Sequence, residues 1–158
     1  MFIQGKMLSG NQDFKDAFDI RRKVFIEEQG ISENDEFNIM DLAAMHAIVY
    51  EDGEYTKAVA TGRILFDGET CKIGKICVIK EFRNRKYGDF TVRMLLNKAF
   101  TAGISEVYLD SQKSTVEFYR KIGFNIIGSE FLKANILHQK MMINVRNIVT
   151  TCNKSNKK

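Results

Sequence analysis

One stretch in the middle of the chain, residues 75–102, constrains the fold more than any other. Residues 75–79 form an apolar run that predicts a strand, and the next nine residues form a turn with four lysines or arginines and one glycine, Gly88. Beyond it, apolar residues recur at the spacing of one helix face: Val92, Leu95, Leu96 and Ala99. The first N–H groups of a helix lack partners within it, and the helix dipole favours negative charge there. We therefore expect this turn to bind the pyrophosphate of a nucleotide cofactor.

The N-terminal part of the chain predicts a strand, a helix and an acidic segment. The strand is expected at Met1–Met7 and the helix at Gln12–Gln29, where apolar residues leave a charged opposite face. The turn Ser9-Gly10-Asn11 should cap the start of the helix, and Gly30 should end it. The segment Ile31–Leu42 carries four acidic residues and is expected to form a loop or a short helix.

Two Asp-Gly pairs then mark tight turns between three strands. The strands are expected at Met45–Tyr50, Lys57–Phe66 and Cys71–Ile79, with turns at Asp52-Gly53 and Asp67-Gly68. This pattern predicts an antiparallel meander. The helix after it, Gly88–Ala102, and a strand at Glu106–Asp110 should complete a right-handed unit whose two strands run parallel.

A second helix and a final pair of strands are predicted in the C-terminal part. Ser114 and Glu117 have the spacing of a capping box, and Gly123 stands where a helix ends in a left-handed residue. The strands are expected at Asn125–Gly128 and His138–Val145, as a hairpin joined by residues 129–137.

Composition and charge limit the class of protein. A chain of 158 residues, 44% hydrophobic and 28% charged, is typical of a soluble globular domain. We expect one domain over residues 1–150, a flexible basic tail at 151–158, no membrane partner and a cytoplasmic location. The net charge of +4 suits an anionic ligand and does not require a nucleic acid, so we expect none. Cys71, Cys77 and Cys152 form no CxxC pattern, so neither a disulfide framework nor a metal site is expected.

Two motifs, in this order, resemble those of a known family. The first is VIKEFRNRKYG at Val78–Gly88, and the second is VEFYRKIGF at Val116–Phe124. Together they resemble the pyrophosphate loop and the Phe-Tyr helix of the GNAT superfamily of acyl-CoA N-acyltransferases. Arg22–Gln29, Ala60–Ile64 and the Asp41-x-x-Ala44-x-His46 segment are similar to its ElaA/YjcF-like branch.

This resemblance implies a fold and a reaction. The fold is α/β (α+β), with a mixed, mostly antiparallel sheet of about six or seven strands, about four flanking helices and a splayed parallel strand pair. The implied reaction moves an acetyl group from acetyl-CoA directly to a primary amine of a small molecule or peptide, without a metal. A homodimer is compatible with it.

The resemblance also assigns the donor site. The pantetheine arm would pair with the strand backbone at Ile76, Cys77 and Val78. The pyrophosphate would bind at Arg83, Asn84, Arg85, Lys86, Tyr87, Gly88 and Asp89. Where this chain has Asn84 and Lys86 the family usually has glycines, which allow a positive φ close to a phosphate. Asparagine tolerates the left-handed conformation better than most residues. We therefore expect this loop either to bind the pyrophosphate more weakly or to depend more on side-chain cations, above all on Arg83.

The catalytic assignments are also implied by the resemblance. Tyr119 matches the tyrosine that protonates the departing thiolate. The base is either Glu28, acting through a water, or His46, oriented by Asp41. The alternative for His46 is a structural role within its strand.

Two further residues are assigned to the acceptor, Glu27 and Arg63. For Arg63 the sequence favours the alternative, a pairing with the acidic segment at residues 33–41.

Three rival functions stay open. Residues 22–25 and 33–37 also resemble acyl-homoserine-lactone synthases, although the chain has no tryptophan. The missing loop glycines are compatible with a degenerate domain that binds acyl-CoA but does not catalyse acyl transfer. Nucleic-acid binding through the basic turn is disfavoured, because aromatic residues do not interleave with the cations.

Overall fold

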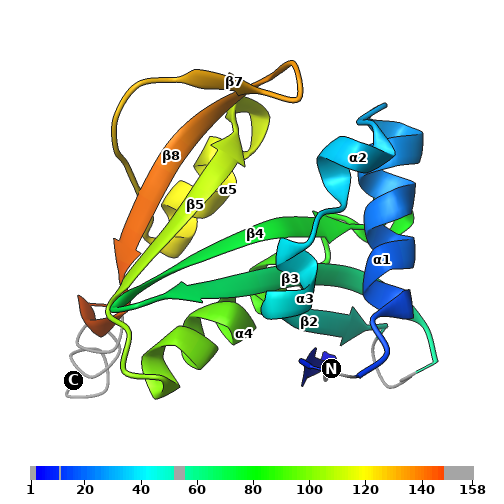
Figure 1. Cartoon of the computed structure of the whole chain (residues 1–158), viewed down its shortest axis with the longest axis horizontal. Coiled ribbons are helices and arrows are strands. Elements are labelled where there is room, and N and C mark those ends of the chain that lie inside the picture. The colour runs from blue at the N-terminus through cyan, green and yellow to red at the C-terminus, as the bar shows by residue number, and fades with distance from the viewer. Residues whose placement is uncertain (1–2, 11, 52–55, 148–158) are drawn as a thin grey trace. The chain divides into compact units, whose positions relative to one another are not determined.

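The computed structural model describes residues 3–10, 12–51 and 56–147 (Figure 1). Its strands are hydrogen-bonded in the order β1-β2-β3-β4-β5-β8-β6, with β7 also paired to β8. The fold is mixed α/β with an eight-stranded, mostly antiparallel sheet and a parallel β4–β5 pair. The predicted fold class is confirmed, with eight strands where about six or seven were expected.

Contacts divide the chain into two compact units, Met1–Leu65 with Ile73–Leu95, and Phe66–Lys72 with Leu96–Lys158. One domain over residues 1–150 stays a prediction. The Asp52-Gly53 turn, Cys152 and the tail at 151–158 lie outside the described residues.

The first unit holds four strands and most of the helices. Its strands are β1 (Gln4–Leu8), β2 (Met45–Tyr50) and most of β3 (Ala58–Asp67) and β4 (Thr70–Val78). Its helices are α1 (Lys15–Arg21), the π-helix η1 (Arg22–Glu28), α2 (Glu33–Glu36), α3 (Met40–Ala43), the 3-10 helix η2 (Lys80–Phe82) and the first part of α4 (Tyr87–Thr101). The predicted strands and α4 are confirmed to within a few residues.

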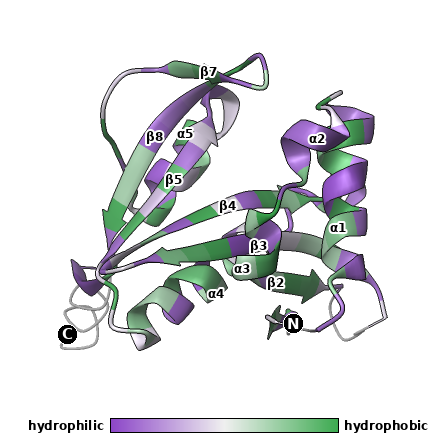
Figure 2. Cartoon of the chain, in the orientation of Figure 1, coloured by the Kyte–Doolittle hydropathy of each residue, from purple (hydrophilic) through white to green (hydrophobic). Residues whose placement is uncertain are grey.

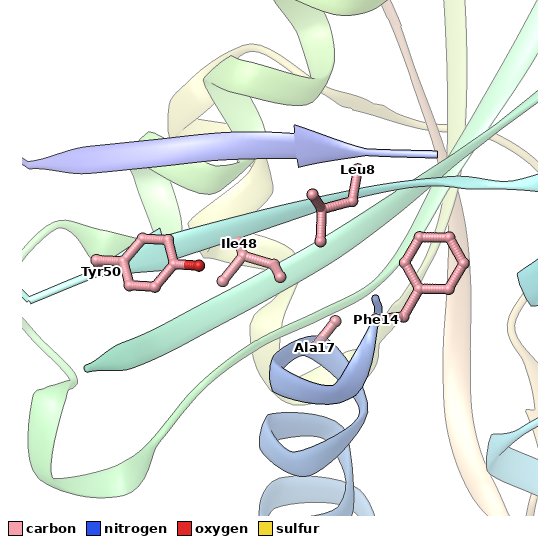
Figure 3. Close-up of a cluster of buried hydrophobic side chains, with 5 residues drawn as sticks. All are labelled: Leu8, Phe14, Ala17, Ile48 and Tyr50. Carbon is pink, nitrogen blue, oxygen red and sulfur yellow. The ribbon is translucent and has the colours of Figure 1, made fainter. Parts of the chain in front are cut away.

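One face of this part of the sheet packs against α1. Successive residues of a strand point to opposite faces, so Ile48 and Tyr50 of β2 share one face. They form an apolar cluster with Leu8, Phe14 and Ala17, which Figure 3 shows between the strands and the start of α1. Burying such side chains supplies most of the stability of a domain this size.

The opposite face packs against α4. Val49 of β2 joins a cluster with Phe82 and Tyr87, which flank the basic turn. Gly62 of β3 allows the close approach, because an added Cβ there would lie 2.9 Å from Leu95 Cδ1. In Figure 2, β2 is largely hydrophobic and α2 largely hydrophilic, as expected for a core strand and a surface helix.

The first helix differs from its prediction at the start and in its type. Helix α1 begins at Lys15, and its N-cap, Phe14, makes no side-chain cap. The carboxylate of Asp13 accepts from the Lys15 amide at 2.9 Å and so satisfies one N–H group of the first turn. The predicted cap at Ser9-Gly10-Asn11 includes Asn11, which lies outside the described residues. Gly30 has φ 73° and ends the helix as predicted.

The second unit is built around the β5–β8 pair. Its elements are β5 (Glu106–Gln112), the 3-10 helix η3 (Lys113–Thr115), α5 (Val116–Ile122), β6 (Asn125–Ile126), β7 (Phe131–Lys133) and β8 (Ile136–Asn144). Residues 70–72 of β4 pair in parallel with residues 106–108 of β5, which confirms the predicted parallel pair. β5 is antiparallel to β8 along its whole length, from the Glu106–Asn144 pair to the Gln112–His138 pair.

One prediction for this unit is wrong, and another is confirmed with an added strand. The capping box at Ser114 does not form, because α5 begins two residues later, after Thr115. The Thr115 hydroxyl donates backwards to the Gln112 carbonyl at 3.0 Å, which holds the chain in η3. The predicted pairing of the two C-terminal strands is confirmed, because β6 is antiparallel to β8. The connector at residues 129–137 contains a further strand, β7, which also pairs with β8. Gly123, with φ 126°, ends α5 as predicted.

Candidate active site

The basic turn keeps the backbone conformation that glycines usually supply. Asn84 has φ 63° and Lys86 has φ 67°, so both lie in the left-handed region. The Phe90 amide donates to the Lys86 carbonyl at 3.0 Å, which makes Lys86 the residue just before α4. The amides of Gly88 and Asp89 therefore belong to the first turn of a 15-residue helix. This is the backbone arrangement that binds a phosphate.

Apolar residues on either side fix the turn to the core. Phe82 and Tyr87 are buried and meet edge to face, with ring centroids 6.2 Å apart. The Thr91 hydroxyl donates to the Tyr87 carbonyl at 2.7 Å. Arg85 lies with its guanidinium 5.5 Å from the centre of the Phe82 ring. Between these anchors, Asn84, Arg85 and Lys86 are exposed and available to a ligand.

Replacing Lys86 with glycine is expected to raise the free energy of unfolding by about 1 kcal/mol. A left-handed conformation costs a side-chain-bearing residue about 1–2 kcal/mol, which the extra flexibility of glycine in the unfolded chain partly offsets. The gain at Asn84→Gly should be smaller, because asparagine tolerates this conformation. Urea unfolding measures both changes.

The matched control for these variants is Arg85→Gly. Arg85 lies between the two positions and is not among the residues with positive φ. The free energy of unfolding of this variant should fall by at least about 0.5–1 kcal/mol, because glycine makes the unfolded chain more flexible and the contact of the Arg85 guanidinium with the Phe82 ring is lost. A Lys86→Gly variant no more stable than the parent would contradict the strain argument.

Arg83 and Glu28 bind each other. The two terminal guanidinium nitrogens of Arg83 donate to the Glu28 carboxylate at 2.7 and 2.8 Å, and its Nε donates to the Val78 carbonyl at 3.0 Å. The hydrogen bond from Arg83 lowers the pKa of Glu28, although burial partly opposes this shift. The expected phosphate contact and the expected base are therefore brought together, with about a third of each side chain exposed.

A hollow of about 280 Å³ opens beside this pair. It is lined by Lys23, Val24, Glu27, Glu28, Ile79, Lys80 and Glu81. The four residues from the N-terminal part all lie on η1, whose π-helical turns are rare and often occur at functional sites. Glu27, assigned to the acceptor, and Glu28, a candidate base, thus line the same hollow in the first unit.

A cluster of five charged side chains lies between α1 and the sheet. Arg21, Glu36 and Asp41 are almost fully buried. Arg21 donates to Glu36 Oε1 and to Asp41 Oδ1, each at 2.7 Å. Arg63 of β3 donates to Asp41 Oδ1 at 2.7 Å, and Lys75 of β4 donates to Glu36 Oε2 at 3.1 Å. Burial alone would raise the pKa of Asp41, but its hydrogen bonds from Arg21 and Arg63 outweigh burial and lower it.

His46 is a buried neighbour of this cluster. Its Nε2 lies 2.9 Å from the Asp41 carbonyl, and its ring lies against Phe14 with centroids 4.5 Å apart. Its Nδ1 finds no partner among the described residues. Burial is the main cause of a lowered pKa for His46. These surroundings match the structural alternative for His46, and its role as a base stays a prediction.

The strand segment assigned to the pantetheine arm begins with an irregularity. Lys75 has φ 53°, a left-handed residue in the middle of β4. Cys77, two residues further along β4, packs against Ile20 of α1 and against Val24 and Phe25 of η1. Burial raises the pKa of Cys77, and it raises the pKa of Cys71 to about 11. Both thiols are therefore packing residues with little thiolate at neutral pH.

Tyr119 lies in the second unit, on α5. It is buried and meets the rings of Phe118 and Phe124 edge to face, at 5.0 and 5.8 Å. The Phe124 amide donates to the Tyr119 carbonyl at 3.1 Å, so the glycine-ended helix fixes the position of the tyrosine. Its catalytic role stays a prediction.

A family model described as "Acetyltransferase (GNAT) domain" matches residues 23–145 of the chain. The chain belongs to the GNAT acetyltransferase family. This confirms the resemblance read from the two motifs. GNAT proteins use acyl-CoA donors, so acyl transfer from CoA is the general chemistry of this fold.

Individual GNAT relatives support the same branch. The chain is 35% identical over 141 residues to "Uncharacterized N-acetyltransferase YjcF" of Bacillus subtilis, covering 89% of this chain and 99% of that protein. It is 33% identical over 148 residues to "Uncharacterized protein YyaT" of the same organism, covering 92% and 98%. The crystal structure of Escherichia coli ElaA matches with a TM-score of 0.78 and 23% identity, covering 89% of this chain and 99% of that one. This last likeness concerns the fold.

Two further observations concern the part of the GNAT chain that the structure describes. Within it, no group of three or more His, Cys, Asp or Glu side chains is placed to hold a metal ion. No helix there has the length and apolar character needed to cross a membrane.

The sequence reasoning missed Arg21, Glu36 and Lys75. A signal existed for Arg21, because Ala17, Ile20 and Val24 place it within the apolar stripe of its helix. An arginine in such a stripe requires buried acidic partners. No comparable signal marks Lys75, whose inward position depends on the left-handed turn in β4.

Proposed function

We propose that this protein is an acetyl-CoA-dependent N-acetyltransferase that moves an acetyl group to a primary amine of a small molecule or peptide. The observation that carries the proposal is the left-handed backbone at Asn84 and Lys86, just before a 15-residue helix. A phosphate needs that backbone path, and this chain adopts it without the usual glycines. The arginines and lysines of the turn add charge that the pyrophosphate would meet.

The proposed donor site continues from the turn into β4. The backbone amides at Arg83–Asp89 bind the pyrophosphate, and the pantetheine arm pairs with β4 at Ile76, Cys77 and Val78. An amide at Cys77 or Val78 polarises the thioester carbonyl, which stabilises the oxyanion as it forms. Because these are backbone contacts, they depend on the path of the strand and not on its side chains.

Proton transfers complete the proposed reaction. Glu28 accepts the proton of the ammonium through a water, and Tyr119 gives a proton to the departing thiolate. In this proposal the acetyl group passes directly to the amine. Of the cysteines that the structure describes, Cys71 and Cys77 are both buried and have raised pKa values. A covalent acyl-cysteine intermediate would need an exposed thiolate.

The primary test is turnover. Protein, acetyl-CoA and a panel of primary amines are mixed, and free thiol and acetylated product are followed by colorimetry and mass spectrometry. Release of CoA with an N-acetyl product supports the proposal. CoA binding without turnover across the panel would instead favour the degenerate acyl-CoA-binding domain, and a lactone formed from S-adenosylmethionine would favour the synthase.

Calorimetry with CoA tests the donor site separately. Arg83→Gln should weaken CoA binding about tenfold or more, because a charge-assisted phosphate contact is lost. Glu28→Gln should strengthen it by up to about fivefold, because Glu28 no longer competes for the guanidinium. The control Glu33→Gln removes the same charge from an exposed residue paired with Arg22. Equal affinities in the parent and Arg83→Gln would remove Arg83 from the phosphate site.

The remaining expectations are part of the proposal. We propose a cytoplasmic location and no metal, nucleic-acid or membrane partner. A homodimer is compatible with the proposal, and nothing in it depends on one.

A further inference from the structure

The cluster of five charged side chains between α1 and the sheet contains more positive than negative charge. It comprises Arg21, Arg63 and Lys75 against Glu36 and Asp41. Every carboxylate oxygen already accepts a hydrogen bond from one of these cations, including Asp41 Oδ2 from Arg21 at 3.3 Å. Three cations therefore share two carboxylates that have no oxygen left unbonded. Charges buried this deeply are normally balanced.

The uncompensated charge lies at the partly exposed edge of the cluster. The side chain of Arg21 is 1% exposed, whereas those of Arg63 and Lys75 are 12% and 15% exposed. Lys75 uses one of its three donors, on Glu36. Arg63 uses only Nη1, on Asp41 and on Asn38 Oδ1 at 3.5 Å, among the partners that the described residues provide. Donors of both side chains remain available to a ligand.

This edge lies beside the proposed path of the donor. Lys75 precedes Cys77 by two residues on β4, a separation of about 7 Å along a strand. Both side chains are on the α1 side of the sheet, because Cys77 packs against Ile20 and Lys75 reaches Glu36, the partner of Arg21. An anion held by Lys75 and Arg63 would therefore lie within a few bonds of an amine attacking the thioester.

We propose that Lys75 and Arg63 form a subsite for a carboxylate of the acceptor, so that the acceptors are small amines that also carry a carboxylate. This inference rests on the proposed acyl transfer and names its substrate class. A carboxylate fits better than a phosphate, because it brings one charge to a cluster with one uncompensated cation. Its two oxygens can accept from Lys75 Nζ and from the Arg63 guanidinium together.

The test uses pairs of amines that differ only in the carboxylate. Glycine, β-alanine and 4-aminobutyrate are each compared with their carboxamides, and aminomethylphosphonate is included. With acetyl-CoA, the best carboxylate should exceed its carboxamide in kcat/KM by about tenfold or more, the scale of a charge-assisted hydrogen bond. Lys75→Met should reduce that preference to within about twofold with the KM for acetyl-CoA unchanged, and Lys75→Arg should keep it.

The matched control is Lys72→Met. Lys72 precedes Lys75 on the same strand, is exposed, and pairs with Asp110. This variant changes the net charge equally and should keep the preference. Circular dichroism and thermal unfolding establish that each variant is folded, and Arg63→Met provides a second removal of charge if Lys75→Met does not fold.

A binding measurement separates this inference from the proposed function. Saturation-transfer NMR follows N-acetylglycine, N-acetyl-β-alanine and their amides with the parent and with Lys75→Met. Binding of the carboxylates to the parent alone supports the subsite even where no amine is acetylated, in which case the proposed function fails. Several outcomes would overturn the subsite. In turnover, these are carboxamides acetylated as fast as carboxylates, a preference for the phosphonate, and a preference for carboxylates that survives both Lys75→Met and Arg63→Met. Finding neither turnover nor binding of any of these compounds would overturn it as well.

Discussion

Replacing Arg21 with methionine is expected to lower the free energy of unfolding by about 3–5 kcal/mol. The side chain of Arg21 is 1% exposed and donates to both Glu36 and Asp41, which are themselves buried. Methionine fills a similar volume but removes the central cation, so that Lys75 and Arg63 are the remaining cationic partners of the two carboxylates. Removing one partner from a buried ionic group costs this much because the remaining charge stays desolvated. Urea unfolding of parent and variant measures the loss.

The neighbouring residue provides the control. Arg22 is also an arginine of this helix and also pairs with a glutamate, but its side chain is 44% exposed and that of Glu33 is 62% exposed. Arg22→Met should change the free energy of unfolding by no more than about 1 kcal/mol. Equal losses in the two variants would show that burial of the Arg21 cluster does not determine its energetic role.

The cluster also gives the protein a defined response to acid. Because the pKa of Asp41 is lower in the folded than in the unfolded chain, its contribution to stability is complete above the unfolded carboxyl pKa of about 3.9. That contribution is lost as the pH falls through the folded pKa. Unfolding titrations of the parent should therefore show no loss from Asp41 between pH 7 and 5, and a growing loss below about pH 4.

Replacing Tyr119 with phenylalanine is expected to lower kcat by about 10²–10⁴-fold and to leave the affinity for acetyl-CoA nearly unchanged. Only the hydroxyl is lost, so the edge-to-face contacts with Phe118 and Phe124 are kept. A general acid acts on the leaving thiolate in the transition state, so its removal lowers turnover by this range and leaves binding intact. Steady-state kinetics and calorimetry measure the two effects separately.

Tyr108→Phe is the matched control for this change. Tyr108 is a tyrosine of the same unit, and its hydroxyl donates to the Glu106 carboxylate at 3.1 Å. Its loss should alter kcat by less than about twofold, as expected for a surface substitution. A Tyr119→Phe enzyme as fast as this control would remove Tyr119 from the acid role.

Much of the fold could be predicted from the sequence because its signals are local. The turn at Gly68 separates two predicted strands, and the apolar spacing of Val92 and Leu95 predicts one face of a helix. Both signals are contained within a few neighbouring residues. The capping box at Ser114 was predicted wrongly for the same reason. Its spacing is a local signal, and the Thr115 hydroxyl has a competing partner in the Gln112 carbonyl that spacing does not reveal.

The candidate site could be predicted only where it depends on the backbone. The basic turn was found because cations and a helix start are adjacent in sequence. The Arg83–Glu28 pair joins residues 55 positions apart, and Lys75–Glu36 joins residues 39 apart, so neither leaves a periodic trace. Long-range ion pairs depend on how helices and strands pack against one another, and a single sequence does not reveal that packing.

In the proposed phosphate loop, Asn84 and Lys86 adopt the left-handed conformation and also carry side chains, whereas glycine provides only the conformation. Glycine permits the positive φ but has no side chain, so a glycine at such a position cannot add charge or hydrogen-bond donors to the loop. Here the buried residues Phe82 and Tyr87 hold the backbone of the turn in place, and the side chains of Asn84 and Lys86 remain exposed. Charge and shape can therefore be varied at these positions while the course of the main chain stays fixed. A search for such loops by torsion angle would find members that a search for glycines passes over.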